Sequence, residues 1–176
     1  VVARYNENID WLKKFKEITL IYNKGLFHDS LKYFQVLQLP NYGRESHTYL
    51  NHIINNYDNL AEYTIFFQGS IKDHKPLALE NYFQQKDFIG YLRNYETHLI
   101  KKPLRHFGKW KNEINNGSIR QSKLTCFEWL KEIIYFDENL KEISTVWGAL
   151  FSVSKNLIHE KPKIFYEQLL RYVDYH

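Results

Sequence analysis

Cysteine and methionine are almost missing from this chain of 176 residues, which contains Cys126 as its one thiol and no Met. A single cysteine excludes an internal disulfide framework and a cysteine-based zinc site, and it is typical of a reducing compartment. We therefore expect a cytoplasmic location. Because the chain begins at Val1 without Met, we also expect that residues before the first strand are absent, which is compatible with a fragment of a longer protein.

Long hydrophobic runs are absent as well. No apolar stretch approaches the roughly 20 residues that a membrane-spanning helix needs. The chain also opens without the basic and then apolar pattern of a signal peptide. The sequence therefore predicts a chain without a membrane span.

Several catalytic and metal-binding motifs are missing too. The chain has no Gly-x-Gly-x-x-Gly, no Walker loop and no Gly-x-Ser-x-Gly elbow, which argues against dinucleotide oxidoreductases, P-loop enzymes and ordinary serine hydrolases. It also has no His-Glu-x-x-His spacing and no Asp-x-Asp pair. A strong metal motif is therefore absent, although Asp73 and His74 could supply one or two ligands.

The residues that are present suit one folded domain. Hydrophobic residues make up 44% of the chain and charged residues 25%, which is enough apolar material for a single core. The net charge is +4, but the lysines are scattered, so this charge favours an anionic partner only weakly. A phosphate-bearing ligand fits this charge as well as a nucleic acid does.

Hydrophobic patterning predicts an α/β fold. Apolar runs rich in β-formers predict strands, and apolar residues at helical spacing predict helices. The expected strands are residues 1–4, 17–22, 32–39, 63–67 and 146–153, and the expected helices are residues 9–15, 49–57, 81–92, 127–134 and 162–173. Asn8 is the expected cap of the first helix. The run YTIFF at residues 63–67 predicts a central strand that is buried on both faces.

Polar residues collect next to three of these elements. The sets are Arg4, Tyr5, Asn6 and Glu7; Gly43, Arg44 and Glu45; and Gln68 and Gly69 followed by Asp73 and His74. In an open α/β sheet, ligands bind beyond the carboxyl ends of the strands, so we expect these sets to share one rim. Gly43 lets backbone amides approach an anion at a helix start, and Arg44 adds donors suited to phosphate.

Each set also has a simpler interpretation. Arg4 with Glu7, and Arg44 with Glu45, could form ion pairs that neutralise each other. Gly43 could be an ordinary turn glycine. A glutamate in a first helical turn is favourable with the helix dipole and needs no catalytic role. The sequence leaves these alternatives open.

Basic and aromatic residues are interleaved over residues 101–111. The basic residues are Lys101, Lys102, Arg105, Lys109 and Lys111, and the rings are His106, Phe107 and Trp110. Such a segment could stack bases and hold the phosphates of a single strand. A solvated loop or an acceptor-side flap is the interpretation that we favour, so we expect no nucleic acid partner.

Four stretches of the chain resemble an uncharacterised domain-of-unknown-function family: VVARYNENIDWL, YNKG, LPNYGRESHTYLNHIINNYDNLAEYTIFFQG and VWGALFSVS. The family pattern runs from a strand and YNE through NxGRExHTYLxHIxxNYDxL to a strand that ends in QG. The resemblance is dense over the first 74 residues and resumes near Trp147. That family in turn resembles nucleotide-sugar glycosyltransferases of the GT-A fold, in which the nucleotide lies across the strand ends.

This resemblance implies a fold and an activity. The fold is a GT-A-like, Rossmann-like three-layer sandwich with a mostly parallel central sheet flanked by helices, formed as a single domain over residues 1–176. The activity is transfer of a sugar from a nucleotide-sugar donor, with a UDP-sugar favoured, to a glycan or glycoprotein acceptor. The alternative is a non-catalytic module of the same fold that binds a nucleotide or a sugar.

The resemblance also implies roles for individual residues. Donor binding falls to Arg4, Tyr5, Asn6, Glu7, Gly43, Arg44, Gln68 and Gly69. The first candidate for the catalytic base is Glu45, with Asp137 and Glu138 as alternatives, and the acceptor side is walled by Trp147, Gly148 and Ala149. TIFFQG stands where such enzymes carry Asp-x-Asp, so a need for Mn²⁺ or Mg²⁺ stays open, with Gln68, Asp73 and His74 as substitute ligands.

Overall fold

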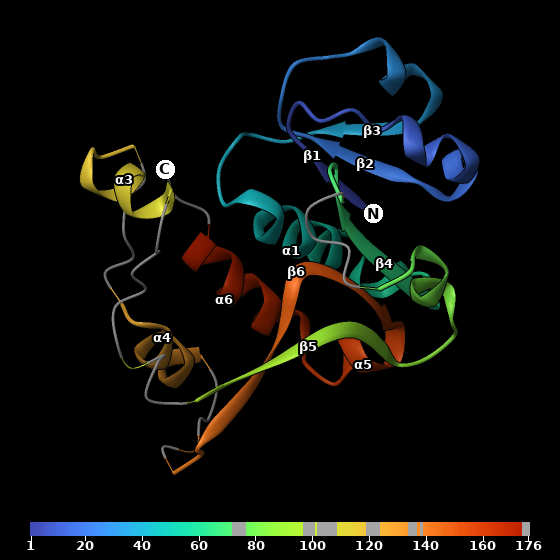
Figure 1. The fold of residues 1–176 in the computed structure, drawn as a ribbon. Helices are drawn as coiled ribbons and strands as arrows, with labels where there is room; N and C mark the ends of the chain where they lie inside the picture. Colours follow the sequence, from blue (N-terminus) through green and yellow to red (C-terminus); the bar gives the residue numbers. More distant parts are fainter. Residues whose placement is uncertain are drawn as a thin grey trace. The chain divides into compact units, whose positions relative to one another are not determined.

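The computed structural model describes residues 1–71, 77–96, 101, 109–118, 124–133, 137 and 139–173, without the side chains of residues 109–111 and 147. The chain forms two compact units, which are residues 1–91 with 146–176, and residues 92–145. The single domain over the whole chain stays a prediction. The candidate site belongs to the first unit, whose strands and helices can be followed in Figure 1.

A six-stranded sheet carries the fold, in the order β3-β2-β1-β4-β6-β5. Its strands are β1 (Val2–Arg4), β2 (Leu20–Asn23), β3 (Gln35–Gln38), β4 (Tyr63–Gln68), β5 (Phe88–Glu96) and β6 (Glu142–Ser154). β1 pairs in parallel with β2 and β4, and β2 pairs in parallel with β3, whereas β6 runs antiparallel to β4. The general α/β class is therefore confirmed, and β1 to β4 all end at one edge of the sheet.

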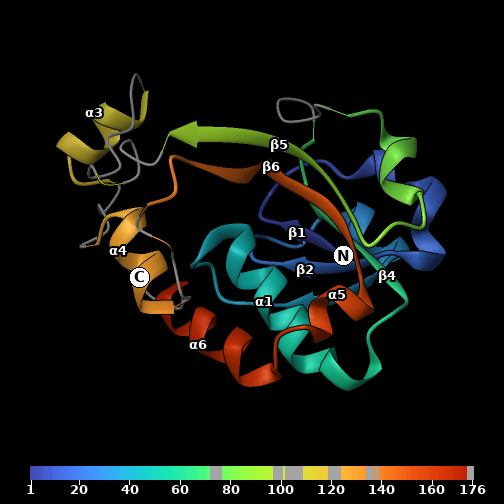
Figure 2. The same cartoon turned by 90° about the horizontal axis from the view of Figure 1, so that it is seen from below.

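Helices connect these strands. They are η1 (Asp10–Ile18), η2 (Asp29–Tyr33), α1 (Arg44–Asn56), η3 (Tyr57–Asn59), η4 (Leu79–Phe83), α3 (Lys109–Asn115), α4 (Cys126–Ile133), α5 (Lys155–His159) and α6 (Lys163–Val173), where η marks a 3-10 helix. α1 packs against α6, and Figure 2 shows both helices with α5 on one side of β1 and β4. No helix in the described part of the chain is long and apolar enough to cross a membrane.

β4 places a core on each of its faces. Phe66 and Phe67 are consecutive, so their side chains point to opposite sides of the sheet, and both are buried. Phe66 packs with Tyr49 and Ile53 of α1, and the ring centroids of Phe66 and Tyr49 lie 4.8 Å apart. Phe67 packs on the other side with residues of η1 and η4, including Tyr82. The predicted burial of this strand on both faces is confirmed.

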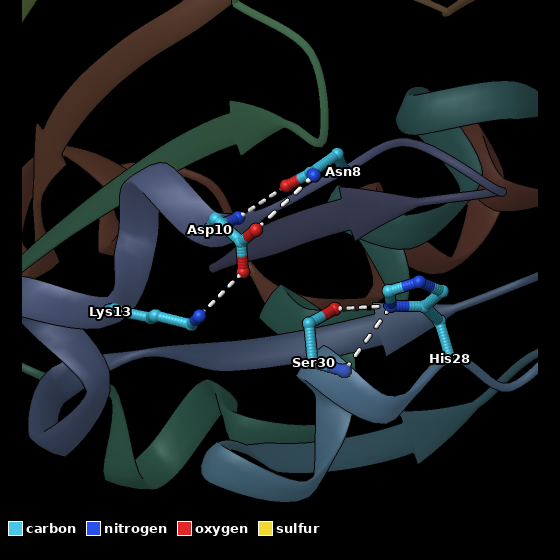
Figure 3. Close-up of polar contacts among 5 residues, drawn as sticks. All are labelled: Asn8, Asp10, Lys13, His28 and Ser30. Atoms are coloured by element: carbon cyan, nitrogen blue, oxygen red, sulfur yellow. Dashed lines mark hydrogen bonds and ion pairs between the residues drawn. The ribbon is translucent and has the colours of Figure 1, made fainter.

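Polar contacts begin the two 3-10 helices that follow β1 and β2 (Figure 3). Asn8 Oδ1 accepts a hydrogen bond from the Asp10 backbone N at 2.7 Å, and the Asp10 carboxylate lies 2.8 Å from Lys13 Nζ. His28 Nδ1 accepts a hydrogen bond from the Ser30 backbone N at 3.2 Å. Asn8 thus orders the start of the first helix, but it lies two residues before η1 and is not its cap.

Two predicted elements are wrong. Residues 81–92 do not form the expected helix, because η4 ends at Phe83 and β5 begins at Phe88. Phe88 and Leu92 have helical spacing, but β5 lies next to β6 in the sheet, and this pairing decides its conformation. The polar turn expected after residue 153 is instead the short helix α5, which Ser154 Oγ caps by accepting a hydrogen bond from Leu157 N.

Other boundaries differ by a few residues. The strand expected over residues 17–22 begins at Leu20, because η1 continues to Ile18. The strand expected over residues 146–153 begins earlier, at Glu142. Of the basic segment, Lys109 and Lys111 belong to α3, and residues 102–108 lie outside the described residues.

Gly43 precedes α1 with a φ of +61°, and an added Cβ would collide with the Val173 carbonyl oxygen and with His47 Cβ. We expect Gly43→Ala to lower the free energy of unfolding by about 3 kcal/mol, because a left-handed backbone alone costs an alanine about 1–2 kcal/mol. Gly117→Ala is the matched control, since Gly117 has a φ of +78° but open space around it. Urea unfolding compares the two variants, and equal losses would contradict the collision.

Candidate functional site

A cavity of about 380 Å³ lies at the carboxyl ends of β1 and β4. Its lining residues are Ala3, Arg4, Tyr5, Glu7, Lys24, Asn41, Arg44, Glu45 and Gln68. All of them except Ala3, Lys24 and Asn41 are predicted site residues. The strand order β3-β2-β1-β4 reverses direction between β1 and β4, and ligands of open α/β sheets bind at such a reversal. The cavity occupies that position.

Arg4, at the end of β1, is 3% exposed and supports this rim. Its Nη1 donates to the carbonyl oxygens of Tyr5 and Leu26, both at 3.0 Å, and to Asn23 Oδ1. Its Nε donates to the carbonyl oxygen of Glu7 at 3.0 Å. Burial lowers the pKa of Arg4, and the charge of Glu7 opposes this effect. Arg4 thus bonds to the backbone of Glu7, in place of the ion pair that the sequence left open.

The Glu7 carboxylate closes the loop after β1. Its Oε2 accepts a hydrogen bond from the Tyr5 backbone N at 2.6 Å. An added Cβ on Gly69 would lie 2.7 Å from the same oxygen, so Gly69 makes room for Glu7. Asn6 Oδ1 accepts a hydrogen bond from the Leu26 backbone N at 2.9 Å, which joins the loops after β1 and β2. Asn6 and Gly69 therefore shape the rim.

Lys24 is a candidate that the sequence analysis missed. It follows β2 directly, is 8% exposed, and donates through Nζ to the carbonyl oxygens of Tyr42, at 2.7 Å, and Arg44. Burial lowers its pKa to about 8, and the charge of Glu45 acts in the opposite direction. Its ammonium group therefore fastens the start of α1 to the end of β2. The available signal was a lysine directly after a strand, in the stretch YNKG.

The start of α1 brings Arg44 and Glu45 to the cavity. Gly43 caps the helix, and its carbonyl oxygen accepts a hydrogen bond from the His47 backbone N at 2.9 Å. Arg44 also has a positive φ, of 46°, and is exposed, whereas Glu45 is half-buried. The first turn of a helix presents backbone amides and the positive end of the helix dipole. This edge of the cavity therefore suits an anion.

Gln68 connects the cavity to the predicted acceptor-side residues of β6. Its Nε2 donates to the Gly148 carbonyl oxygen at 2.8 Å, and the Tyr49 hydroxyl donates to the Ala149 carbonyl oxygen at 3.1 Å. Gly148 and Ala149 have φ values of 75° and 53°, so β6 is irregular at this point. The structure thus brings Gly148 next to Gln68, while the Trp147 side chain lies outside the described residues.

The remaining predicted residues lie elsewhere in the chain. Asp137 belongs to the second unit, where its Oδ1 accepts a hydrogen bond from the Asn139 backbone N at 2.9 Å. Glu138, Asp73 and His74 fall outside the described residues. Among the residues that the structure describes, no group of three or more His, Cys, Asp or Glu side chains could hold a metal ion.

A family profile described as a protein of unknown function, DUF3431, matches residues 1–175. No curated protein matches the chain. The match extends over the middle of the sequence as well as over the segments that suggested an uncharacterised family. That part of the sequence interpretation is confirmed, and the further likeness to glycosyltransferases stays a prediction.

The lowered pKa of Lys24 predicts how stability depends on pH. The folded-state pKa of about 8 lies below the ordinary lysine value of 10.5, so the unfolded chain holds this proton more tightly. The free energy of unfolding of the wild type should therefore rise relative to that of Lys24→Met as the pH increases through this interval, and stay level below it. Urea unfolding of both proteins at several pH values measures the difference. A difference that does not change with pH would contradict the assignment.

Proposed function

This chain belongs to the DUF3431 family of proteins of unknown function, and we propose that it transfers a sugar from a nucleotide-sugar donor, preferably a UDP-sugar, to a glycan or glycoprotein acceptor. The observation that carries this proposal is the cavity beyond β1 and β4, where Lys24 and Arg44 lie with one carboxylate, Glu45, at a helix start. Cations beside a carboxylate suit a reaction in which a diphosphate departs while a hydroxyl group loses its proton.

The GT-A-like three-layer sandwich is part of the same proposal. Its support is the parallel pairing of β1 with β2 and β4, together with cores on both faces of β4. A further support is the position of the cavity at the reversal of strand order, where dinucleotides and mononucleotides bind in related α/β sheets.

In this proposal the diphosphate of the donor binds at the start of α1. Lys24 contributes an ammonium group that is largely protonated at pH 7, since its pKa is about 8. Arg44 contributes a planar guanidinium group suited to two phosphate oxygens. The nucleoside lies along the loop after β1, where Tyr5 is 49% exposed and offers a ring face for stacking.

Glu45 is the proposed base in an inverting transfer. It accepts the proton of the acceptor hydroxyl, and the hydroxyl oxygen forms a bond to the anomeric carbon. The bond from that carbon to the diphosphate oxygen breaks, and its electron pair leaves with the diphosphate. Lys24 and Arg44 stabilise the charge that develops there. Asp137 and Glu138 stay the alternative bases.

The described residues of the cavity fit a divalent metal ion poorly. Its carboxylates are Glu7 and Glu45, and Glu7 Oε2 already accepts a hydrogen bond from Tyr5 N. Glu45 in turn lies within the electrostatic reach of the Lys24 ammonium group. Since such ions are held by several free oxygen ligands, the proposed step does not pass through a metal.

A non-catalytic module that binds a nucleotide or a sugar is the second candidate function. It is favoured by the way in which Arg4 and Glu7 use their polar atoms, because both hydrogen-bond to the rim itself. The two candidates differ in turnover. An enzyme releases UDP from a UDP-sugar at least by slow hydrolysis, whereas a binding module keeps the donor intact.

Titration calorimetry with UDP, GDP and their common sugars, with and without Mn²⁺, tests the ligand class. We expect one nucleotide series to bind, and Lys24→Met to weaken that binding about tenfold or more, because it removes a charged donor. Lys32→Met is the matched control, since Lys32 is an exposed residue of η2, and it should leave the affinity unchanged. No binding of any series to the wild type would overturn both candidate functions.

Glu45→Gln tests catalysis separately from binding. We expect UDP release from the bound sugar donor to fall at least about 100-fold, because the amide cannot accept the proton. The affinity for UDP should stay within a small factor of the wild type. Glu62→Gln, which alters an exposed glutamate before β4, is the control and should keep full turnover. Full turnover of Glu45→Gln would remove Glu45 from the role of base, and intact binding without turnover in the wild type would favour the binding module.

A further inference from the structure

A second cavity, of about 420 Å³, lies at the opposite edge of the same strands. Leu20 and Tyr63, which line it, are the first residues of β2 and β4. The first cavity is lined by Arg4 and Gln68, which end β1 and β4. The two cavities are therefore separated by the length of the strands, and each has its own lining.

Two buried hydroxyl groups line this second cavity without a hydrogen-bond partner. Thr64 is 5% exposed and Tyr82 is 1% exposed. Within the part of the chain that the structure describes, neither Thr64 Oγ1 nor the Tyr82 hydroxyl has a partner in the protein. Buried polar groups nearly always have one, so unpaired hydroxyls in a cavity wall indicate a bound molecule that supplies it.

The side chains around these hydroxyls carry no charge at neutral pH. His52 is the one that could, but its ring is neutral because burial lowers its pKa to about 4. Asn56 Nδ2 lies 3.4 Å from His52 Nδ1 and can only donate, so Nδ1 accepts and Nε2 carries the proton. The rest of the lining is apolar, aromatic or amide, as in Ile18 and Leu20. An ionic ligand would lack a counter-charge there.

We propose that this second cavity binds a small uncharged molecule that joins an apolar ring to a hydroxyl or carboxamide group, and that Thr64 and Tyr82 hydrogen-bond to that group. Both hydroxyls can donate and accept, which suits a ligand group that does the same. A volume of about 420 Å³ is in the range of small-molecule sites. The proposal is independent of sugar transfer at the first cavity.

The charge requirement is tested on the full chain with phenol and benzamide as neutral probes and benzoate as the charged counterpart, by ligand-observed NMR titration. We expect a neutral probe to bind at least about tenfold more tightly than benzoate, because the cavity offers no partner for a carboxylate. If neither neutral probe binds, or if benzoate binds as tightly, the proposal is overturned.

The two hydroxyls are tested with Thr64→Val and Tyr82→Phe, which keep the shape of each side chain. Each change should weaken binding of the neutral probe about fivefold, as expected for one hydrogen bond. Thr48→Val is the matched control, because Thr48 Oγ1 is also buried without a partner among the described residues but does not belong to the described cavity lining. Affinity unchanged in both Thr64→Val and Tyr82→Phe would overturn the assignment.

Two further readouts separate this site from the first cavity and from bound water. The affinity for UDP should be the same in the wild type, Thr64→Val and Tyr82→Phe, whether or not UDP binds at all. In the absence of probe, the midpoint of urea unfolding should not fall in either variant, because an unpaired hydroxyl is removed. A lower midpoint in both variants would mean that the hydroxyls are already bonded, and would count against a ligand site.

Discussion

The carboxyl edge of the sheet depends on the burial of one guanidinium group. Arg4 ends β1 inside the protein, and a buried cation is tolerated only where its donors are hydrogen-bonded. The acceptors are the carbonyl oxygens of Tyr5, Glu7 and Leu26 and the side chain of Asn23. Because they come from the end of β2 and the loops that follow β1 and β2, burying Arg4 requires both loops to turn back over the strand ends. The rim of the first cavity is therefore set by the hydrogen-bonding needs of one of its own wall residues.

Lys24 repeats this arrangement one strand away. Its acceptors are again backbone carbonyls, those of Tyr42 and Arg44, which lie just before and at the start of α1. Neutral acceptors satisfy the hydrogen bonds of a cation but leave its charge uncompensated. Glu7 and Glu45 offset part of that charge, while Arg4, Lys24 and the amide end of α1 add to it. An anionic ligand would complete the balance, which is the physical reason to look for a diphosphate at this edge.

The sequence predicted what local patterns and sheet geometry decide, and missed what distant partners decide. β4 was predictable because YTIFF has no polar position, and the rim because parallel strands end together. β5 was not, since Phe88 and Leu92 suit either period and only the neighbouring β6 selects a strand. Lys24 was missed because a lysine after a strand is usually solvated, and the carbonyls that bury it come from residues about twenty positions later. Thr64 looked like an ordinary strand residue, because no sequence pattern indicates that its hydroxyl is unpaired.

The two cavities differ in the charge they accept because α1 runs between them. Its first residues, Arg44 and Glu45, line the cavity at the carboxyl edge, and His52, in its last turns, lines the other. A helix carries partial positive charge at its start and partial negative charge at its end, so one helix favours an anion at the first site and disfavours an anion at the second. A neutral His52 adds no charge to counter this. A ligand of the second cavity therefore has to be recognised through shape and single hydrogen bonds, whereas a ligand of the first is drawn in by charge.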